Sequence, residues 1–219
     1  MNKSPGKGPI SISLGVIGGS GAYDLLTNGA LGENVDTITL ETPFGKSAPI
    51  HHFRAGNLEY LFLSRHGEKD YSITAPFVNY RANIHVLKQL HVTHLLAVSA
   101  VGIMQEQIRP GDMVVPNQLF DRTKGVRLST FFGEGIVGHM TFADPFCEEL
   151  RAVIIDAGRE AGAKLHAGGT YICMEGPLFS TRAESNFYRD SVGAAVIGMT
   201  ALPEAKLARE AEMCYATVA

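Results

Sequence analysis

Residues 169–184 read GTYICMEGPLFSTRAE, and this stretch decides the expected fold. It begins as an apolar, β-prone run, breaks at a Gly-Pro pair and restarts as a helix at Thr181. Thr181 followed three residues later by Glu184 is a capping-box pattern, in which the hydroxyl and the carboxylate each satisfy a free backbone donor. Open α/β sheets place their ligands where a buried strand runs into a short loop before a helix. We therefore expect Phe179 and Ser180, which lie in that loop, to line a binding site.

Strands and helices alternate along the rest of the chain. The apolar run at residues 94–98 suits a strand buried on both faces. Asp144-Pro145 is typical of a helix start, an N-cap followed by proline at the first helical position. Such alternation implies a largely parallel sheet covered on both faces. We predict an α/β fold of three α/β/α layers, with a mixed, mostly parallel twisted sheet flanked by helices. We expect a single domain over residues 12–219, after a flexible leader at residues 1–11.

Composition narrows the classes of protein that this chain can belong to. Hydrophobic residues make up 45% and charged residues 19% of the 219 residues, an ordinary globular balance. The formal net charge is -3 and no basic run stands out, which argues against nucleic-acid binding as the main function. No apolar run approaches the ~20 residues that span a bilayer, and the first residues do not resemble a signal peptide. We therefore expect a cytoplasmic protein with no membrane partner.

The three cysteines, Cys147, Cys173 and Cys214, form no CxxC pair, and each has apolar neighbours. This pattern favours small buried thiols in a reducing compartment. A zinc site would need clustered ligands, and the close histidine pairs have no cysteine nearby. We expect no metal site.

Three predicted strands end in a similar way, with polar side chains beside glycine. The first ends in GGSG at residues 18–21 and carries Ser20, the next ends with Arg65 and His66, and a third ends at Ser99. Glycine-rich backbone, hydroxyls and an arginine fork are all anion ligands. The first loop could also be a bare structural turn or, with poorly matched glycine spacing, a dinucleotide loop. Three such endings favour a shared anion pocket along one edge of a sheet.

A long segment at residues 117–140 is rich in loop-forming residues and holds His139. A loop of that length is either functional or disordered, and a lone loop histidine is more often an incidental surface residue. The last six residues, 214–219, look like a buried strand with no turn, charge or helix after it. Burying a terminal carboxylate there is costly, so we expect the fold's last element to be missing from this sequence.

Five ordered motifs resemble those of the trimeric purine nucleoside phosphorylase family, and most closely its branch acting on 5'-methylthioadenosine. The resemblance covers nearly the whole chain after residue 11. The motifs are GGSG at 18–21, SRHG at 64–67, SAVG at 99–102, EGPLFSTRAE at 175–184 and MTALPE at 199–204.

The resemblance implies phosphorolysis of a purine nucleoside to a free base and a sugar 1-phosphate, with inorganic phosphate as co-substrate, no other cofactor, and a homotrimer as the assembly. Carried over by motif, the residues that bind phosphate would be Ser20, Arg65, His66, Ser99, Ala100 and Thr200. Met199 would lie under the ribose and Phe179 against the nucleoside. His139 would reach the 5' pocket of a neighbouring subunit. Glu175 is expected to brace its loop rather than to titrate in catalysis.

Ser180 bears on the choice of base, since related 6-oxopurine enzymes have a glutamate at this point of the motif. Serine fits the methylthioadenosine branch, with methylthioinosine or 6-oxopurine nucleosides as the alternative substrates. Family members continue into an Asp-Tyr-Asp motif whose aspartate protonates the leaving purine, a position beyond Ala219. Since such protonation contributes ~10²–10⁴-fold, we expect the 219-residue form to be weakly active or inactive. A non-catalytic nucleoside-binding protein is the alternative from another class.

Overall fold

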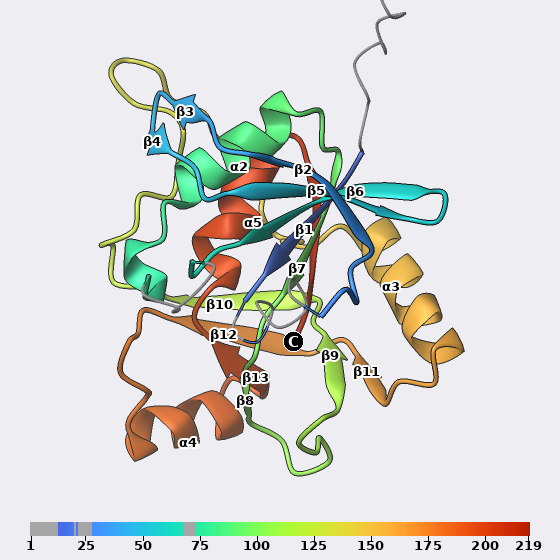
Figure 1. Ribbon diagram of the computed structural model, residues 1–219. Coiled ribbons are helices and arrows are strands. Elements are labelled where there is room, and N and C mark those ends of the chain that lie inside the picture. Colours follow the sequence, from blue (N-terminus) through green and yellow to red (C-terminus); the bar gives the residue numbers. More distant parts are fainter. Residues whose placement is uncertain (1–12, 20, 22–27, 68–72) are drawn as a thin grey trace, which may run out of the picture.

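A computed structural model describes residues 13–19, 21, 28–67 and 73–219 of the chain. Two sheets form its framework, one of six strands and one of four (Figure 1). The six-stranded sheet has the order β14-β7-β1-β6-β5-β2 and the four-stranded sheet the order β10-β12-β13-β8. Two short pairs, β9 with β11 and β3 with β4, complete the strands of the described residues.

The strands of the six-stranded sheet are parallel at its centre and antiparallel at one side. β14, β7, β1 and β6 run parallel, whereas β5 is antiparallel to both β6 and β2. The bounds are β1 Leu14–Gly18, β2 Glu33–Ile38, β5 Ile50–Ala55, β6 Leu58–Ser64, β7 His94–Val98 and β14 Cys214–Val218.

In the four-stranded sheet, β10, β12 and β13 are parallel and β8 is antiparallel to β13. The bounds are β8 Gly102–Ile103, β10 Gln118–Arg122, β12 Thr170–Met174 and β13 Ala194–Gly198. The short pairs are β9 Met113–Val115 with β11 Leu165–Ala167, and β3 Glu41–Thr42 with β4 Gly45–Lys46. The predicted mixed, mostly parallel α/β fold is confirmed, with its strands divided between two sheets.

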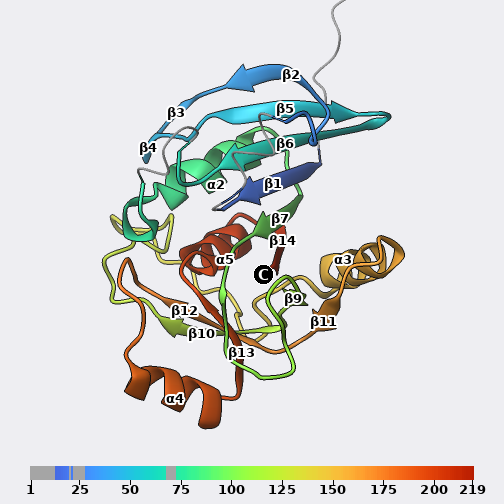
Figure 2. The same ribbon diagram turned by 60° about the horizontal axis from the view of Figure 1, so that its bottom comes forward.

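Helices lie between the sheets and outside them. α5 (Ala201–Glu210) contacts both α2 (Tyr80–Gln89) and β14, and Figure 2 shows it between the two sheets. α4 (Arg182–Asp190) lies on the far side of the four-stranded sheet, and α3 (Glu148–Glu160) packs beside β14. A single 3-10 turn, η1 (Ala75–Phe77), precedes α2. No helix in these ranges is long and apolar enough to cross a bilayer.

Local sequence explains the helix starts, with one correction. The predicted capping box forms, because Thr181 Oγ1 accepts from Glu184 N and the Glu184 carboxylate accepts from Thr181 N. The predicted start of α3 at Asp144-Pro145 is wrong, since the helix begins at Glu148. Cys147 instead has extended backbone, and its N–H donates to the Tyr215 carbonyl at 2.8 Å. Pairing with β14 thus keeps the preceding residues out of the helix.

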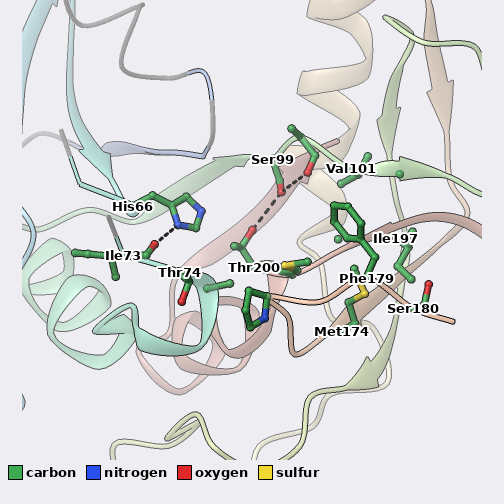
Figure 3. A pocket seen from close by; sticks show the side chains of 16 residues that line it. His66, Ile73, Thr74, Ser99, Val101, Met174, Phe179, Ser180, Ile197 and Thr200 are labelled. Carbon is green, nitrogen blue, oxygen red and sulfur yellow. Dashed lines mark hydrogen bonds between the residues drawn. The ribbon is translucent and has the colours of Figure 1, made fainter. Parts of the chain in front are cut away.

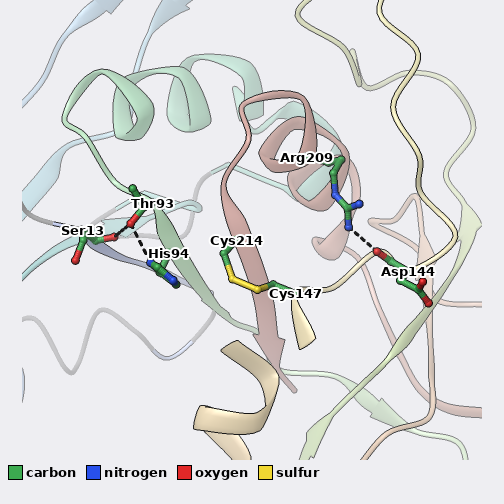
Figure 4. The surroundings of a disulfide bond; sticks show 7 residues. All are labelled: Ser13, Thr93, His94, Asp144, Cys147, Arg209 and Cys214. Atoms are coloured by element: carbon green, nitrogen blue, oxygen red, sulfur yellow. Dashed lines mark hydrogen bonds between the residues drawn. A yellow bond between two sulfur atoms is a disulfide. The ribbon is translucent and has the colours of Figure 1, made fainter. Parts of the chain in front are cut away.

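The expectation of three free thiols is also wrong. Cys147 and Cys214 form a disulfide that ties the residue before α3 to the first residue of β14 (Figure 4). Only Cys173 is a free cysteine, and it is buried. A cross-link of this kind typically stabilises a fold by about 2–4 kcal/mol, largely by restricting the unfolded chain. The two cysteines are 67 residues apart, so no local pattern indicated the pair.

Candidate active site

A cavity of about 630 Å³ opens where strands from both sheets end. Its walls come from the residues after β6, β7, β12 and β13, together with the segment before η1 (Figure 3). These are the strand ends at which the sequence predicted a binding site. The predicted site residues that line it are His66, Ser99, Ala100, Phe179, Ser180, Met199 and Thr200.

One side of the cavity carries the hydroxyl groups of Ser99 and Thr200, with the buried Tyr171 hydroxyl behind them. Ser99 Oγ lies 3.2 Å from Thr200 Oγ1 and 3.5 Å from the Tyr171 hydroxyl. Burial raises the pKa of Tyr171 to about 12, so its hydroxyl stays neutral and remains a donor. A Cβ on Gly198 would lie 2.0 Å from that hydroxyl oxygen, so only glycine lets Tyr171 reach Ser99. The arrangement offers neutral donors to an anion.

His66 borders the hydroxyl side from the end of β6. Its Nδ1 lies 2.8 Å from the Ile73 carbonyl oxygen. A carbonyl can only accept, so we assign the proton to Nδ1, which leaves Nε2 for a ligand. Burial lowers the pKa of His66, which favours the neutral ring. A neutral Nε2 accepts a hydrogen bond from a protonated phosphate oxygen, and a protonated Nε2 donates one.

Arg65 is turned into the protein rather than toward the cavity. Its Nε donates to Glu204 Oε1 at 2.6 Å and its Nη2 to Glu204 Oε2 at 3.2 Å, with both side chains almost fully buried. Nη1 donates to the Val98 carbonyl at 2.9 Å. Burial opposes the charged form, but Glu204 outweighs it and raises the pKa of Arg65. The predicted anion fork is thus engaged by Glu204 and lies behind the cavity-lining residues.

The opposite side of the cavity is mostly apolar. Met174, Ile197, Met199 and Phe179 line it, and 84% of the Phe179 surface is exposed. Figure 3 shows Met174, Ile197 and Phe179 on the side away from His66. Ser180 Oγ lies 2.8 Å from Ser185 Oγ in the first turn of α4. A flat base and an apolar sugar substituent suit such a wall, with the serine as its polar group.

Besides Arg65, one more predicted site residue that the structure describes does not line the cavity. His139 lies exposed on the segment 123–147, which has neither helix nor strand, and it does not line the cavity. Its reach into a neighbouring subunit stays a prediction. Ser20 falls outside the described residues.

Sequence reasoning missed Arg127, one of the most buried charged side chains that the structure describes. It pairs with Glu175 at 2.5 Å and is 2% exposed. Glu175 is thereby engaged as a brace of its loop, as the sequence indicated. Arg127 lies in a segment without periodicity, so no signal in the sequence distinguished it from a solvated arginine. Glu204 belongs to the MTALPE motif at residues 199–204, but nothing in the sequence indicated that it pairs with Arg65.

Comparison with known proteins bears on this site. The sequence matches the phosphorylase superfamily over residues 13–219. The chain belongs to that superfamily. It is 54% identical over 209 residues to the S-methyl-5'-thioadenosine phosphorylase of Geobacter sulfurreducens, covering 94% of this chain and 70% of that protein. The chain is also 49% identical to the S-methyl-5'-thioadenosine phosphorylase of Hyperthermus butylicus, in an alignment that covers 100% of this chain and 78% of that protein.

Solved structures give the same family. The methylthioadenosine phosphorylase of Schistosoma mansoni superposes with a TM-score of 0.87 at 38% identity, covering 94% of this chain and 79% of that one. A methylthioadenosine phosphorylase from an Antarctic soil metagenomic library has a TM-score of 0.87 at 45% identity, with coverage of 95% and 71%. The resemblance predicted from five motifs is confirmed.

Proposed function

We propose that this protein is an S-methyl-5'-thioadenosine phosphorylase, which converts 5'-methylthioadenosine and inorganic phosphate to adenine and 5-methylthioribose 1-phosphate. One observation carries the proposal: hydroxyls from β7 and β13 face an apolar wall across a single cavity of about 630 Å³. The names of the relatives at about 50% identity support it.

The two sides of the cavity divide the substrates between them. Phosphate binds at Ser99, Ala100, Thr200 and His66, and Arg65 supports that side from behind. The ribose lies on Met199, and the base lies between Phe179 and Ser180.

In the reaction, a phosphate oxygen forms a bond to the anomeric carbon while the bond from that carbon to N9 of adenine breaks. The bonding electrons leave with the base, which takes up a proton. Positive charge develops on the sugar, so preorganised groups that place the phosphate anion beside it lower the barrier. Inorganic phosphate is the only co-substrate, and the reaction uses no metal or organic cofactor.

The proposal includes a homotrimer. Val126 and Leu128 are 60% and 62% exposed, and with Pro76 and Val78 they line a depression of about 180 Å³. Ile136 and Val137, on the same segment as His139, are 66% and 76% exposed. Exposed apolar surface of this kind is typical of contacts between chains. Light scattering on the full-length protein tests this, since a monomer would overturn it.

A cytoplasmic location is also part of the proposal, supported by the ordinary globular composition. The Cys147–Cys214 disulfide is the observation against it, because such bonds are rare in reducing compartments. Cell fractionation decides between the two.

The activity is tested by following base release from 5'-methylthioadenosine with the full-length protein, with and without phosphate. We expect release to require phosphate and kcat/KM to exceed that for methylthioinosine and inosine by at least about tenfold. Release without phosphate would show a hydrolase, and a preference for inosine would show a 6-oxopurine enzyme. Tight nucleoside binding without turnover would show a binding protein. Each of these three results would overturn the proposal.

A further inference from the structure

We propose that Arg127 is a positioning residue for nucleoside binding, because its guanidinium group fixes the ends of β12 and β13 that form the apolar wall. The inference rests on the proposed function, since it assigns that wall to the nucleoside. Arg127 is not among the cavity-lining residues, so it acts through the main chain.

The hydrogen bonds of Arg127 end on main-chain carbonyls at the ends of two neighbouring parallel strands. Nη1 donates to the carbonyls of Met199 and Leu202, the latter at 2.6 Å, and Nη2 donates to those of Glu175 and Met174, the latter at 3.3 Å. Met174 and Glu175 lie at the end of β12, Met199 follows β13 and Leu202 lies at the start of α5, and all four are beyond the last β12–β13 pair. Buried carbonyls need a donor, and one planar guanidinium supplies it to all four.

The same carbonyls belong to the residues that shape the cavity. Met174 and Met199 both line the cavity, and Arg127 binds the main chain of each. Gly176 has φ +74°, and a Cβ there would lie 2.5 Å from Met199 Sδ. The chain after β12 therefore packs directly on the side chain after β13. A shift of either strand end would therefore move Met174 or Met199, and with it the lining of the cavity.

The loop that carries Arg127 is itself fixed by Glu175. The Glu175 carboxylate accepts from Arg127 Nε at 2.5 Å and from Lys124 N at 2.6 Å. The Tyr80 hydroxyl of α2 lies 3.4 Å from Arg127 Nη1. The guanidinium thus has its charge balanced and its orientation set from three elements, as a positioning group requires.

Three of the four residues on the hydroxyl side, His66, Ser99 and Ala100, follow strands of the other sheet, and only Thr200 follows β13, beside Met199. Ser99 follows β7 in the other sheet, where Arg65 donates to the neighbouring Val98 carbonyl. Loss of the Arg127 contacts should therefore weaken nucleoside binding more than phosphate binding. A merely structural role would weaken both alike or neither.

Arg127→Lys tests the proposal, with Arg151→Lys as its matched control. Arg151 is also a buried arginine, and it donates to the Pro116 carbonyl at 2.8 Å and the Val115 carbonyl at 3.3 Å, away from the cavity. Calorimetry on the full-length protein gives Kd for 5'-methylthioadenosine and for inorganic phosphate, and thermal unfolding gives Tm. We expect Arg127→Lys to raise the nucleoside Kd about 10- to 100-fold and the phosphate Kd by less than about threefold. Arg151→Lys should lower Tm but change each Kd by less than about twofold. Equal effects of Arg127→Lys on both ligands, or none on the nucleoside, would overturn the inference.

A double variant keeps the test decisive if Arg127→Lys fails to fold. Arg127→Met with Glu175→Gln leaves no unpaired buried charge, yet removes the donor from the four carbonyls. We expect its Tm to exceed that of Arg127→Met alone while nucleoside binding stays weak. Recovery of nucleoside affinity together with Tm would overturn the inference. The proposed function is judged separately, by phosphate-dependent turnover of the wild type.

Discussion

Arg65 and Arg127 are both buried and both pair with a glutamate, but they differ in what else they bind. Arg65 uses Nε and Nη2 on the two oxygens of Glu204 and donates to two main-chain carbonyls, those of Val98 and Ile17. Arg127 gives only Nε to the Glu175 carboxylate and directs its other nitrogens mainly to main-chain carbonyls. Arg65 is therefore half of an ion pair between β6 and α5. Arg127 is a cap on two strand ends.

The two sides of the cavity are therefore supported in different ways, one by each arginine. The hydroxyl side is built on a charge pair between distant elements, and Tyr215 donates to the same Glu204 carboxylate at 3.0 Å. The apolar side is built on main-chain geometry fixed by one side chain from a loop. Stability is thus concentrated in the first pair, and the shape of the site in the second.

The largest expected effect is on stability, in matched Glu→Gln variants of the two pairs. Glu204→Gln leaves the Arg65 charge buried without a carboxylate, which should lower the free energy of unfolding by about 3–5 kcal/mol. Glu175→Gln also removes a carboxylate from a buried arginine, but Arg127 keeps four carbonyl acceptors whereas Arg65 keeps two. The Glu175 side chain is also more exposed than that of Glu204, so this loss should be about 1–3 kcal/mol. Urea unfolding at one protein concentration, with m-values compared, measures both. An equal or larger loss for Glu175→Gln would remove the distinction between the pairs.

The next effect separates the ligands, through two serines on opposite sides of the cavity. Ser99→Ala removes a hydroxyl donor to an anion and should raise KM for phosphate about 10- to 100-fold, with KM for the nucleoside within about twofold. Ser180→Ala removes a neutral hydrogen bond and should raise KM for the nucleoside by up to about tenfold, without a change for phosphate. Initial rates at varied concentrations of each substrate give the four values. If Ser99→Ala moved the nucleoside KM instead, the assignment of the hydroxyl side to phosphate would be wrong.

A smaller effect comes from His66, on the Arg65 side. Burial lowers the pKa of His66 below its ordinary value of 6.5, so the folded state favours the neutral ring. The unfolded chain takes up a proton first as pH falls, and stability is lost from about pH 6.5 down through the folded pKa. We expect Tm to fall more between pH 7 and pH 5 in the wild type than in His66→Gln. An equal fall in both proteins would show that His66 does not titrate in this way.

The smallest expected effect is a change in the reactivity of the Cys173 thiol, which is connected to Arg127 through Leu202. Cys173 Sγ accepts from Leu202 N at 3.3 Å, and the Leu202 carbonyl accepts from Arg127. Burial raises the pKa of Cys173 to about 12, so the native thiol should not react with an alkylating agent at pH 8. Arg127→Lys should react slowly at Cys173, as read by peptide mass spectrometry, while Arg151→Lys should not. Rapid alkylation of the wild type would show that this strand end opens without any change at Arg127.

The sequence indicated the lining of the site better than its supports. Ser99 and Phe179 were predicted because they follow buried strands, whose ends meet at one edge of a sheet. Thr200 and Met199 were predicted from the resemblance to the family's motifs. The direction of the Arg65 side chain was not predictable, since its partner Glu204 is 139 residues away. Arg127 gave no signal, because a lone arginine in a loop is usually solvated.

The helix start before α3 and the disulfide were missed for a related reason. Asp144-Pro145 is a good helix start by local rules, but a bond from Cys147 to Tyr215 of β14 takes precedence. Local patterns thus set strands, caps and motifs. Contacts between residues far apart in the chain decide where buried charges and cysteines find partners.

The division of the cavity is tested most directly by a crystal structure of the full-length protein with 5'-methylthioadenosine and the phosphate mimic sulfate. We expect sulfate within hydrogen-bond distance of Ser99 Oγ, Thr200 Oγ1 and His66 Nε2, and the nucleoside on Met199 with its base between Phe179 and Ser180. Sulfate on the apolar side, or a nucleoside bound away from Met199, would contradict the division.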